Sequence, residues 1–360
     1  MSKVIRIWLL FLVLILSVGN SGNSQQHNLK LDRANFLYFL DNPTEVQDLE
    51  AIALYEDALS EVPDKSDAMA FVQASERLGN LYLAYGKVNE AKKIYDQGIL
   101  MARAFQVVDT LVYSHHLYLG ETFFALNQLD SSLFHLQQAE MLQQKIRQNA
   151  EPERLYNALG VYFYETGNFN QSVSYFSKAE SYLKGDNPEL ERYAKFSFSS
   201  NKASALYRLE EYEQARAIYL ELLKFGINTD PLRINLANTY IEQEKSLEAL
   251  VVLDSIDSEF AVSSLSFHNL RSKVFFQLKE VEKLENQLSI GQKLIDADSS
   301  GSKNLQKGIF YLLKGDLELL KESPETALRY YQTALVQLHP DFDQADPYVN
   351  PEQLILGMGA

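Results

Sequence analysis

The sequence predicts an all-α protein, an α-solenoid built from repeated pairs of helices. Three observations support this prediction. A short pattern of small and aromatic residues recurs along the chain, mostly at intervals of about forty residues. Only 9 prolines and 16 glycines occur among 360 residues, too few to separate the many short strands of an all-β protein. The 21 tyrosines and 20 phenylalanines fall mostly at helical spacings.

The recurring pattern begins with a small residue, and an aromatic or bulky residue follows three positions later. A second small residue comes twelve positions after the first, and a third comes seven positions after the second. Three clear examples are Gly79, Tyr82, Ala91 and Gly98; Gly120, Phe123, Ser132 and Ala139; and Gly160, Phe163, Ser172 and Ala179. We expect each set to mark one pair of helices, in which the small residues let the backbones pack closely.

This pattern resembles the tetratricopeptide repeat, a helix–turn–helix unit that stacks on its neighbours. If the first small residue is position 8 of a repeat, the repeats start near residues 32, 72, 113, 153, 196, 230, 264 and 308. The resemblance implies a right-handed superhelix of seven or eight repeats over residues 25–340. One such unit cannot bury its apolar face alone, so we expect stability to come from contacts between neighbours.

The match to the pattern is uneven at two repeats. In the repeat near 264, Arg271 stands where the first small residue belongs and Lys283 stands at the second small position. The repeat near 32 has a regular second helix, marked by Ala51, Tyr55 and Ala58, but an irregular first helix. Terminal repeats are often atypical because they cap the stack.

The first 24 residues differ in kind from the rest. Lys3 and Arg6 precede an apolar run over residues 7–18, and small polar residues lead to Ser24. This arrangement predicts a secretory signal peptide over residues 1–24, cleaved after Ser24. An uncleaved anchor helix is the alternative, although twelve residues are short for a hydrocarbon layer about 30 Å thick. We therefore expect an exported protein, periplasmic or extracellular, with no stable membrane insertion after cleavage.

The composition argues against several kinds of chemistry and partner. A formal charge of −15 disfavours binding to nucleic acid, because the phosphate backbone would be repelled. The sequence has no cysteine, which excludes disulfides, thiolate zinc sites and a cysteine nucleophile. It also lacks a phosphate-binding glycine loop and the nucleophile pattern Gly-x-Ser-x-Gly. We therefore expect no catalytic residues, no cofactor and no enzyme activity.

The histidines do not form a metal-binding pattern. Only His115 and His116 are adjacent. Neighbouring residues on a helix point about 100° apart, so these two side chains are poorly placed to bind the same metal ion. We expect no metal site, with one of these two side chains facing a groove and the other packed.

The resemblance also implies where a partner would bind. In tetratricopeptide proteins the first helix of each repeat lines a concave groove, with positions 2, 5, 9 and 12 facing inward. The candidate groove residues are Asn80, Glu121, Phe124, Asn157, Tyr164, Tyr207 and Asn238. Such a mixture suits an extended peptide or a helix of a protein partner. The alternative remains open that the aromatic members only pack between neighbouring first helices. The expected function is a scaffold for protein–protein interaction.

A second resemblance concerns residues 328–351. There a Tyr-Tyr-Gln-x-Ala-Leu helix leads to a Pro-x-Phe stretch and then to Asn350-Pro351. This resembles the segment after the last repeat in bacterial secreted proteins of the CHAT type, notably from Bacteroidetes, in which a caspase-like peptidase domain usually follows. The sequence ends about ten residues later, so residues 341–360 are expected to be a tail or a truncated junction. The alternative function is a regulatory or substrate-recruiting part of such a peptidase system.

Overall fold

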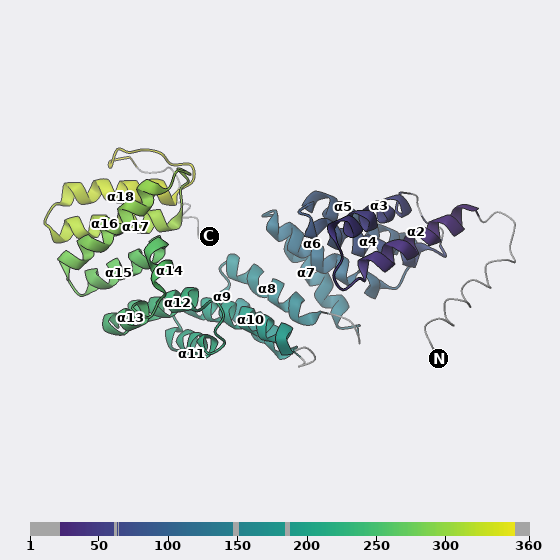
Figure 1. Cartoon of the computed structure of the whole chain (residues 1–360), viewed down its shortest axis with the longest axis horizontal. Coiled ribbons are helices and arrows are strands. Elements are labelled where there is room, and N and C mark those ends of the chain that lie inside the picture. Colours follow the sequence, from purple (N-terminus) through teal and green to yellow (C-terminus); the bar gives the residue numbers. More distant parts are fainter. Residues whose placement is uncertain (1–21, 61–62, 64, 147–150, 184–187, 350–360) are drawn as a thin grey trace. The chain divides into compact units, whose positions relative to one another are not determined.

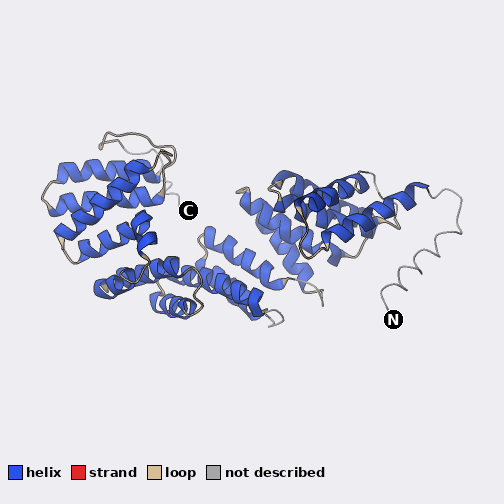
Figure 2. Ribbon diagram, viewed as in Figure 1, coloured by secondary structure: helices blue, strands red, loops and turns tan. Residues whose placement is uncertain are grey.

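The computed structural model describes residues 22–60, 63, 65–146, 151–183 and 188–349. Every regular element in these ranges is a helix (Figure 2). The all-α fold that the sequence predicts is therefore confirmed. The chain divides into two compact units, residues 1–151 and residues 152–360, and each is described by itself.

Unit 1 contains three consecutive helix pairs among its described residues (Figure 1). We call the first helix of a pair the A helix and the second the B helix. The pairs are α2 (Gly22–Tyr38) with α3 (Glu45–Ala58), α4 (Ala68–Ala84) with α5 (Val88–Ala104), and α6 (Tyr113–Ala125) with α7 (Leu129–Gln143). A short 3₁₀ helix, η1 (Asp109–Val112), precedes α6.

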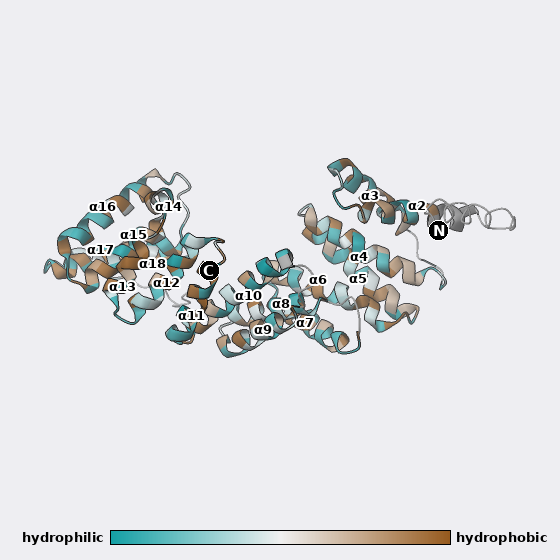
Figure 3. Cartoon of the chain, turned by 60° about the horizontal axis from the view of Figure 1, so that its bottom comes forward, coloured by the Kyte–Doolittle hydropathy of each residue, from teal (hydrophilic) through white to brown (hydrophobic). Residues whose placement is uncertain are grey.

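Unit 2 contains five consecutive pairs in its described part. They are α8 (Pro152–Glu165) with α9 (Phe169–Ser181), α10 (Pro188–Arg208) with α11 (Tyr212–Leu223), α12 (Thr229–Glu242) with α13 (Ser246–Leu253), α15 (Leu265–Gln277) with α16 (Val281–Ala297), and α17 (Leu305–Leu320) with α18 (Pro324–Leu338). One extra short helix, α14 (Ser258–Ser263), lies between the third and fourth pairs. In both units hydrophilic and hydrophobic residues alternate around the helices (Figure 3), as expected when one face of each helix is buried.

Seven of the A helices, from α4 onward, end in the same tight turn. One residue in each turn has a positive φ: Gly86, Asn127, Gly167, Glu210, Glu244, Lys279 and Glu322. In the first of them the amide of Lys87 donates to the carbonyl of Tyr82 at 2.8 Å, which is the long hydrogen bond of a Schellman motif. The positive-φ residue always follows the first small residue of the repeat by seven positions. This turn therefore fixes the register of each repeat independently of the sequence pattern.

The register of the repeat near 264 was predicted one residue too early. Its turn residue is Lys279, so the first small position is Ser272, which is 1% exposed. The third small position is then Gly291, which packs against a neighbouring phenylalanine. Arg271 and Lys283, which seemed to break the pattern, instead form ion pairs with nearby carboxylates. A short helix, α14, lies in the connection that precedes this repeat.

The first repeat also begins earlier than the start near residue 32 implies. The hydroxyl of Tyr55 donates to Oδ1 of Asn35 at 2.7 Å, and the next repeat makes the same hydrogen bond between equivalent residues. By that equivalence the first small residue is Ala34, which is fully buried. The predicted register would have placed it at Phe39, which is 66% exposed. The reason is a connection between α2 and α3 that is longer than the three-residue turns elsewhere.

The first small residue of each repeat makes room for a large B-helix side chain. A Cβ built on Gly79 would lie 2.3 Å from Cε1 of Tyr95, and one built on Gly160 would lie 2.6 Å from Cδ1 of Phe176. The second small residue lies against the same backbone, since Oγ of Ser172 donates to the carbonyl of Gly160 at 2.9 Å. Small residues at these places therefore set how closely the A and B helices of one repeat approach.

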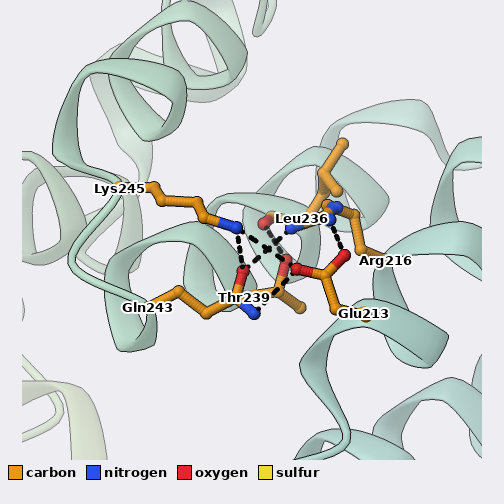
Figure 4. A network of polar contacts seen from close by, with 6 residues as sticks. All are labelled: Glu213, Arg216, Leu236, Thr239, Gln243 and Lys245. Atoms are coloured by element: carbon orange, nitrogen blue, oxygen red, sulfur yellow. Dashed lines mark hydrogen bonds and ion pairs between the residues drawn. The ribbon is translucent and has the colours of Figure 1, made fainter.

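A polar network joins the pairs α10–α11 and α12–α13 within unit 2 (Figure 4). Arg216 on α11 donates to Oε1 of Gln243 at 2.8 Å, and Nε2 of Gln243 donates to Glu213 at 3.0 Å. The ammonium of Lys245 lies 3.2 Å from the Glu213 carboxylate. Glu213 is 60% exposed, and exposed ion pairs add little to the free energy of unfolding. We therefore infer that this network orients the two helix pairs more than it stabilises the fold.

Both ends of the repeat array have separate features. Of the predicted signal segment over residues 1–24, residues 1–21 lie outside the described residues, and residues 22–24 form the start of α2. No helix in the described part is long and apolar enough to cross a membrane. After α18, the ammonium of Lys303 donates to the carbonyls of His339, Pro340 and Phe342 at 2.9–3.2 Å. This lysine therefore holds the following segment against the last repeat.

Candidate functional site

A cavity of about 480 Å³ opens on the A helices of unit 2. Helices α10, α12, α15 and α17 supply its walls. We call it the A-helix cavity, and its lining residues are Tyr207, Ile234, Asn238, Glu242, Ser266, Asn269, Leu270, Lys273, Phe276, Gln277, Gln306, Ile309, Leu312, Leu313 and Asp316. Most of them lie at positions 2, 5, 9 and 12 of their repeats once the register is corrected. The size is within the range of sites that bind small molecules or single peptide side chains.

The cavity combines an apolar wall with a charged rim. Leu270 and Leu313 are largely buried in its wall, while Leu312 is 38% exposed at its edge. At the rim the Lys273 ammonium lies 2.6 Å from the Glu242 carboxylate. The same carboxylate accepts a hydrogen bond from the hydroxyl of Tyr207 at 3.3 Å.

One cavity-lining residue, Asn269, carries a buried polar atom without a partner. Asn269 is 2% exposed, and its Nδ2 donates to the carbonyl of Gln306 at 2.9 Å and to Oε1 of the same residue at 3.1 Å. A backbone carbonyl can only accept, so this contact fixes the orientation of the amide. Oδ1 of Asn269 is then buried without a hydrogen bond. An orphaned acceptor of this kind is costly, and an N–H or O–H group of a ligand would satisfy it.

Position 9 of a repeat is free for a ligand only where no B-helix tyrosine reaches it. In four repeats the tyrosine hydroxyl contacts the position-9 side chain, which is Asn35, Asn80, Ser204 or Asp316. In α13 and α16 the equivalent B-helix residues are Leu253 and Leu288, which have no hydroxyl. Asn238 accordingly makes no side-chain hydrogen bond among the described residues, and its amide is available in the A-helix cavity.

The structure brings some of the sequence-predicted groove residues together. Tyr207 and Asn238 both line the A-helix cavity. Tyr164 lines a separate hollow of about 160 Å³ on α8, α9 and α10, beside Asn201. The amide of Asn201 also donates to Oδ1 of Asn157 at 3.4 Å. Four of the seven predicted residues therefore lie in or next to these two hollows of unit 2.

The other three predicted residues lie in unit 1. Glu121 and Phe124 are half-buried on α6. Asn80 is committed to internal contacts, because its Oδ1 accepts from Tyr95 at 2.7 Å and its Nδ2 donates to Tyr38 at 3.1 Å. Its side chain therefore links neighbouring helices of the unit.

Sequence reasoning missed the cavity residues on α15 and α17. The predicted groove residues end with Asn238 of the repeat near 230, and the register expected for the next repeat, with Arg271 as the small residue, is one residue too early. With Ser272 as the small residue, Asn269 and Lys273 fall at positions 5 and 9. The signal that could have corrected the register is Gly291, nineteen residues after Ser272 as in the regular repeats.

The adjacent histidines are both buried, and neither lines the A-helix cavity. Nε2 of His115 lies 2.8 Å from Oγ of Ser75, and neither residue is exposed. Nδ1 of His116 lies 2.9 Å from Nδ1 of His135. Within the described ranges no three histidine, aspartate or glutamate side chains converge in a way that could hold a metal ion.

Comparison with known proteins identifies the fold. No family model and no curated protein matches the sequence. Among solved structures, apo RapI is similar with a TM-score of 0.63 at 14% identity, covering 87% of each chain. A signal-transduction ATPase from Pyrococcus horikoshii with a tetratricopeptide repeat sensor gives 0.55 at 15% identity, covering 89% of this chain and 53% of that one. A tetratricopeptide repeat protein from Parabacteroides merdae gives 0.47 at 13% identity, covering 84% and 99%. By its structural neighbours, the chain has the fold of a tetratricopeptide repeat protein.

Proposed function

We propose that unit 2 binds an extended peptide segment of a partner protein in the A-helix cavity. The observation that supports this most strongly is the buried, unpartnered Oδ1 of Asn269 in a cavity of about 480 Å³. A buried acceptor without a partner is costly, and a ligand donor is one of the groups that can complete it. The main-chain amide of a peptide supplies the required donor.

The surrounding side chains favour a particular peptide chemistry. The free amide of Asn238 can bond a second backbone group of an extended segment. An aliphatic or aromatic side chain of the peptide would fill the space beside Leu270, Leu313 and Ile309. Glu242 and Asp316 outnumber the single cation Lys273, so a peptide with basic residues next to its apolar anchor is favoured over an acidic one.

A selection experiment with matched variants tests this proposal. The full chain is used to select binders from a phage-displayed library of random dodecapeptides, and the affinity of the winners is measured by isothermal titration. Leu312→Lys places a cation at the cavity edge and should weaken binding at least tenfold. Leu328→Lys is the control, because Leu328 is 37% exposed on α18, outside the cavity, compared with 38% for Leu312. Failure to select any binder, or equal losses for the two variants, would refute the proposal.

We also infer that the protein acts outside the cytoplasm and without catalysis. The cationic and apolar segment over residues 1–24 supports export. The buried Ser75–His115 contact, to which no substrate has access, offers no nucleophile, which supports a binding role. Amino-terminal sequencing of the protein from its native host tests the first point. A mature chain beginning at Gln25 is expected, and an intact Met1 in a cytoplasmic fraction would contradict it.

A second candidate is recruitment for a CHAT-type, caspase-like peptidase. The motif over residues 328–351 favours it, together with the way Lys303 fixes the segment after α18. In this alternative the A-helix cavity would present a substrate to a separate peptidase. A neighbouring gene encoding a peptidase domain with a catalytic His and Cys would support it, provided that its product copurifies with this chain. A copurified partner without such a domain would argue against it.

A further inference from the structure

A second cavity, of about 470 Å³, lies in unit 1 and contains none of the predicted groove residues. It is formed by α5, η1, α6 and α7, and we call it the α5–α7 cavity. Its lining residues are Ile99, Ala102, Arg103, Gln106, Val107, Asp109, Val112, His116, Gln138, Met141, Leu142 and Lys145. The site is separate from the one proposed for peptide binding and is argued independently.

Half of the lining residues are apolar. Ala102 and Val112 belong to a buried cluster with Val72, and Ile99, Val107 and Leu142 pack around it. Aliphatic walls of this kind favour an alkyl or aryl group, because filling them removes apolar surface from water.

One buried polar side chain also faces this space. His116 is 8% exposed, and its Nδ1 is hydrogen-bonded to Nδ1 of His135 at 2.9 Å. Its Nε2 has no hydrogen-bond partner among the described residues. Burial, followed by the nearby His135 and Arg103, lowers the pKa of His116 to about 4, so the ring is neutral at pH 7. If His135 donates to Nδ1, the remaining proton of His116 is on Nε2, where it can be donated to a bound acceptor.

The charges at the cavity favour an anion. Arg103 is exposed and makes no ion pair within the described residues. Lys145 lies 4.0 Å from Asp109, and both side chains are more than half exposed, so this pairing is weak. Two cations and one carboxylate give the site a net positive charge in a chain whose formal charge is −15. Such a local excess attracts small anions.

We propose that the α5–α7 cavity binds a small amphipathic carboxylate with an alkyl or aryl body. The apolar body occupies the space between Ile99, Val112 and Leu142. The carboxylate accepts charge-assisted hydrogen bonds from the Arg103 guanidinium and a further hydrogen bond from Nε2 of His116. The binding is reversible and involves no covalent step.

Decanoate is the probe, and decanol is its uncharged counterpart of equal chain length. The full chain, labelled with [methyl-¹³C]methionine, is titrated with each compound below the concentration at which decanoate forms micelles. Met141 lines the cavity, whereas Met69 is a comparably exposed methionine on α4 outside it. Decanoate should shift the Met141 methyl resonance in a saturable way and leave that of Met69 in place.

Two charge variants identify the anion-binding group. Arg103→Gln should weaken decanoate binding about tenfold, as expected for loss of an exposed charge-assisted hydrogen bond, and should leave the weaker binding of decanol unchanged. Arg329→Gln removes the same charge from exposed α18 in the other unit and should have no effect. The proposal is overturned if decanoate causes no saturable shift of Met141, if decanol binds as tightly as decanoate, or if both variants bind decanoate equally well.

Discussion

The replacement Gly79→Ala tests the packing rule on which the repeat fold depends. A Cβ at this position would lie 2.3 Å from Cε1, 2.4 Å from Cζ and 2.8 Å from Cδ1 of Tyr95. The Tyr95 ring is fully buried and lies 5.8 Å, centroid to centroid, from the rings of both His115 and Tyr118. It therefore cannot move aside without disturbing these neighbours.

The expected magnitude follows from three opposing contributions. Overpacking a tight core costs about 1–3 kcal/mol. A shift of the ring also weakens the 2.7 Å hydrogen bond from Tyr95 to Asn80, which costs about 0.5–1.5 kcal/mol. Replacing glycine by alanine inside a helix stabilises the helix by about 1 kcal/mol. We expect a net loss of about 1–3 kcal/mol in the free energy of unfolding.

A double-mutant cycle makes this prediction specific to the Gly79–Tyr95 contact. Tyr95→Val removes the three ring atoms that a Cβ would strike, so Gly79→Ala should cost about 1–2 kcal/mol less in that background. Gly86→Ala is the control, because its strain comes from φ +69° and no atom lies within 4 Å of the built Cβ. Urea unfolding followed by circular dichroism, with amide hydrogen exchange of α4 and α5, measures both. A stable Gly79→Ala variant, or costs additive within about 0.5 kcal/mol, would refute the packing argument.

Three further predictions follow from the described side chains. Glu322→Gly should raise the free energy of unfolding by about 0.5–1 kcal/mol, because glycine relieves the strain of φ +58° at that turn; unchanged urea midpoints would contradict this. Burial lowers the pKa of both His116 and His135 to about 4, so the unfolded chain binds more protons and stability should fall as pH drops from about 6.5 to 4. His135→Gln should reduce that loss by about 1–2 kcal/mol in melting experiments across this pH range, and an unaltered pH profile would count against it. Glu213→Gln should cost less than about 1 kcal/mol, since its ion pairs are largely exposed, and a larger change in the urea midpoint would show that the network stabilises more than we infer.

The fold was predictable because the packing constraint is local. Gly79, Gly120 and Gly160 each stand where a Cβ would strike a large B-helix side chain, so the sequence must keep a small residue there. A pattern imposed by such contacts is visible in one sequence without any alignment. For this reason the helical pairs could be expected before their coordinates were known.

The register of irregular repeats was less predictable, since it depends on insertions that the pattern does not mark. The long α2–α3 connection displaced the expected small residue of the first repeat from Phe39 to Ala34, and in the fourth repeat of unit 2 the small residue is Ser272. The turn residues that reveal the true register include Glu210, Glu244 and Lys279. These residue types do not favour a positive φ, so their conformation is imposed by packing of the two helices.

The candidate site was predictable only in part. Positions 2, 5, 9 and 12 include Tyr207 and Asn238, which line one cavity, but they could not show that the Asn80 side chain is hydrogen-bonded to Tyr95. That distinction depends on whether the facing B helix carries a tyrosine or a leucine. The orphaned Oδ1 of Asn269 depends on its contact with Gln306, a residue 37 positions away. Such a long-range contact leaves no local trace in the sequence.

Hydrogen exchange of the full chain, with and without a selected peptide, tests the central claim most directly. If the peptide occupies the A-helix cavity, amides of α12, α15 and α17 should exchange more slowly in the complex, while those of α13, α16 and α18 should change little. Protection confined to the B helices or to unit 1, or no protection at saturating peptide, would contradict binding at Asn269 and the account built on it.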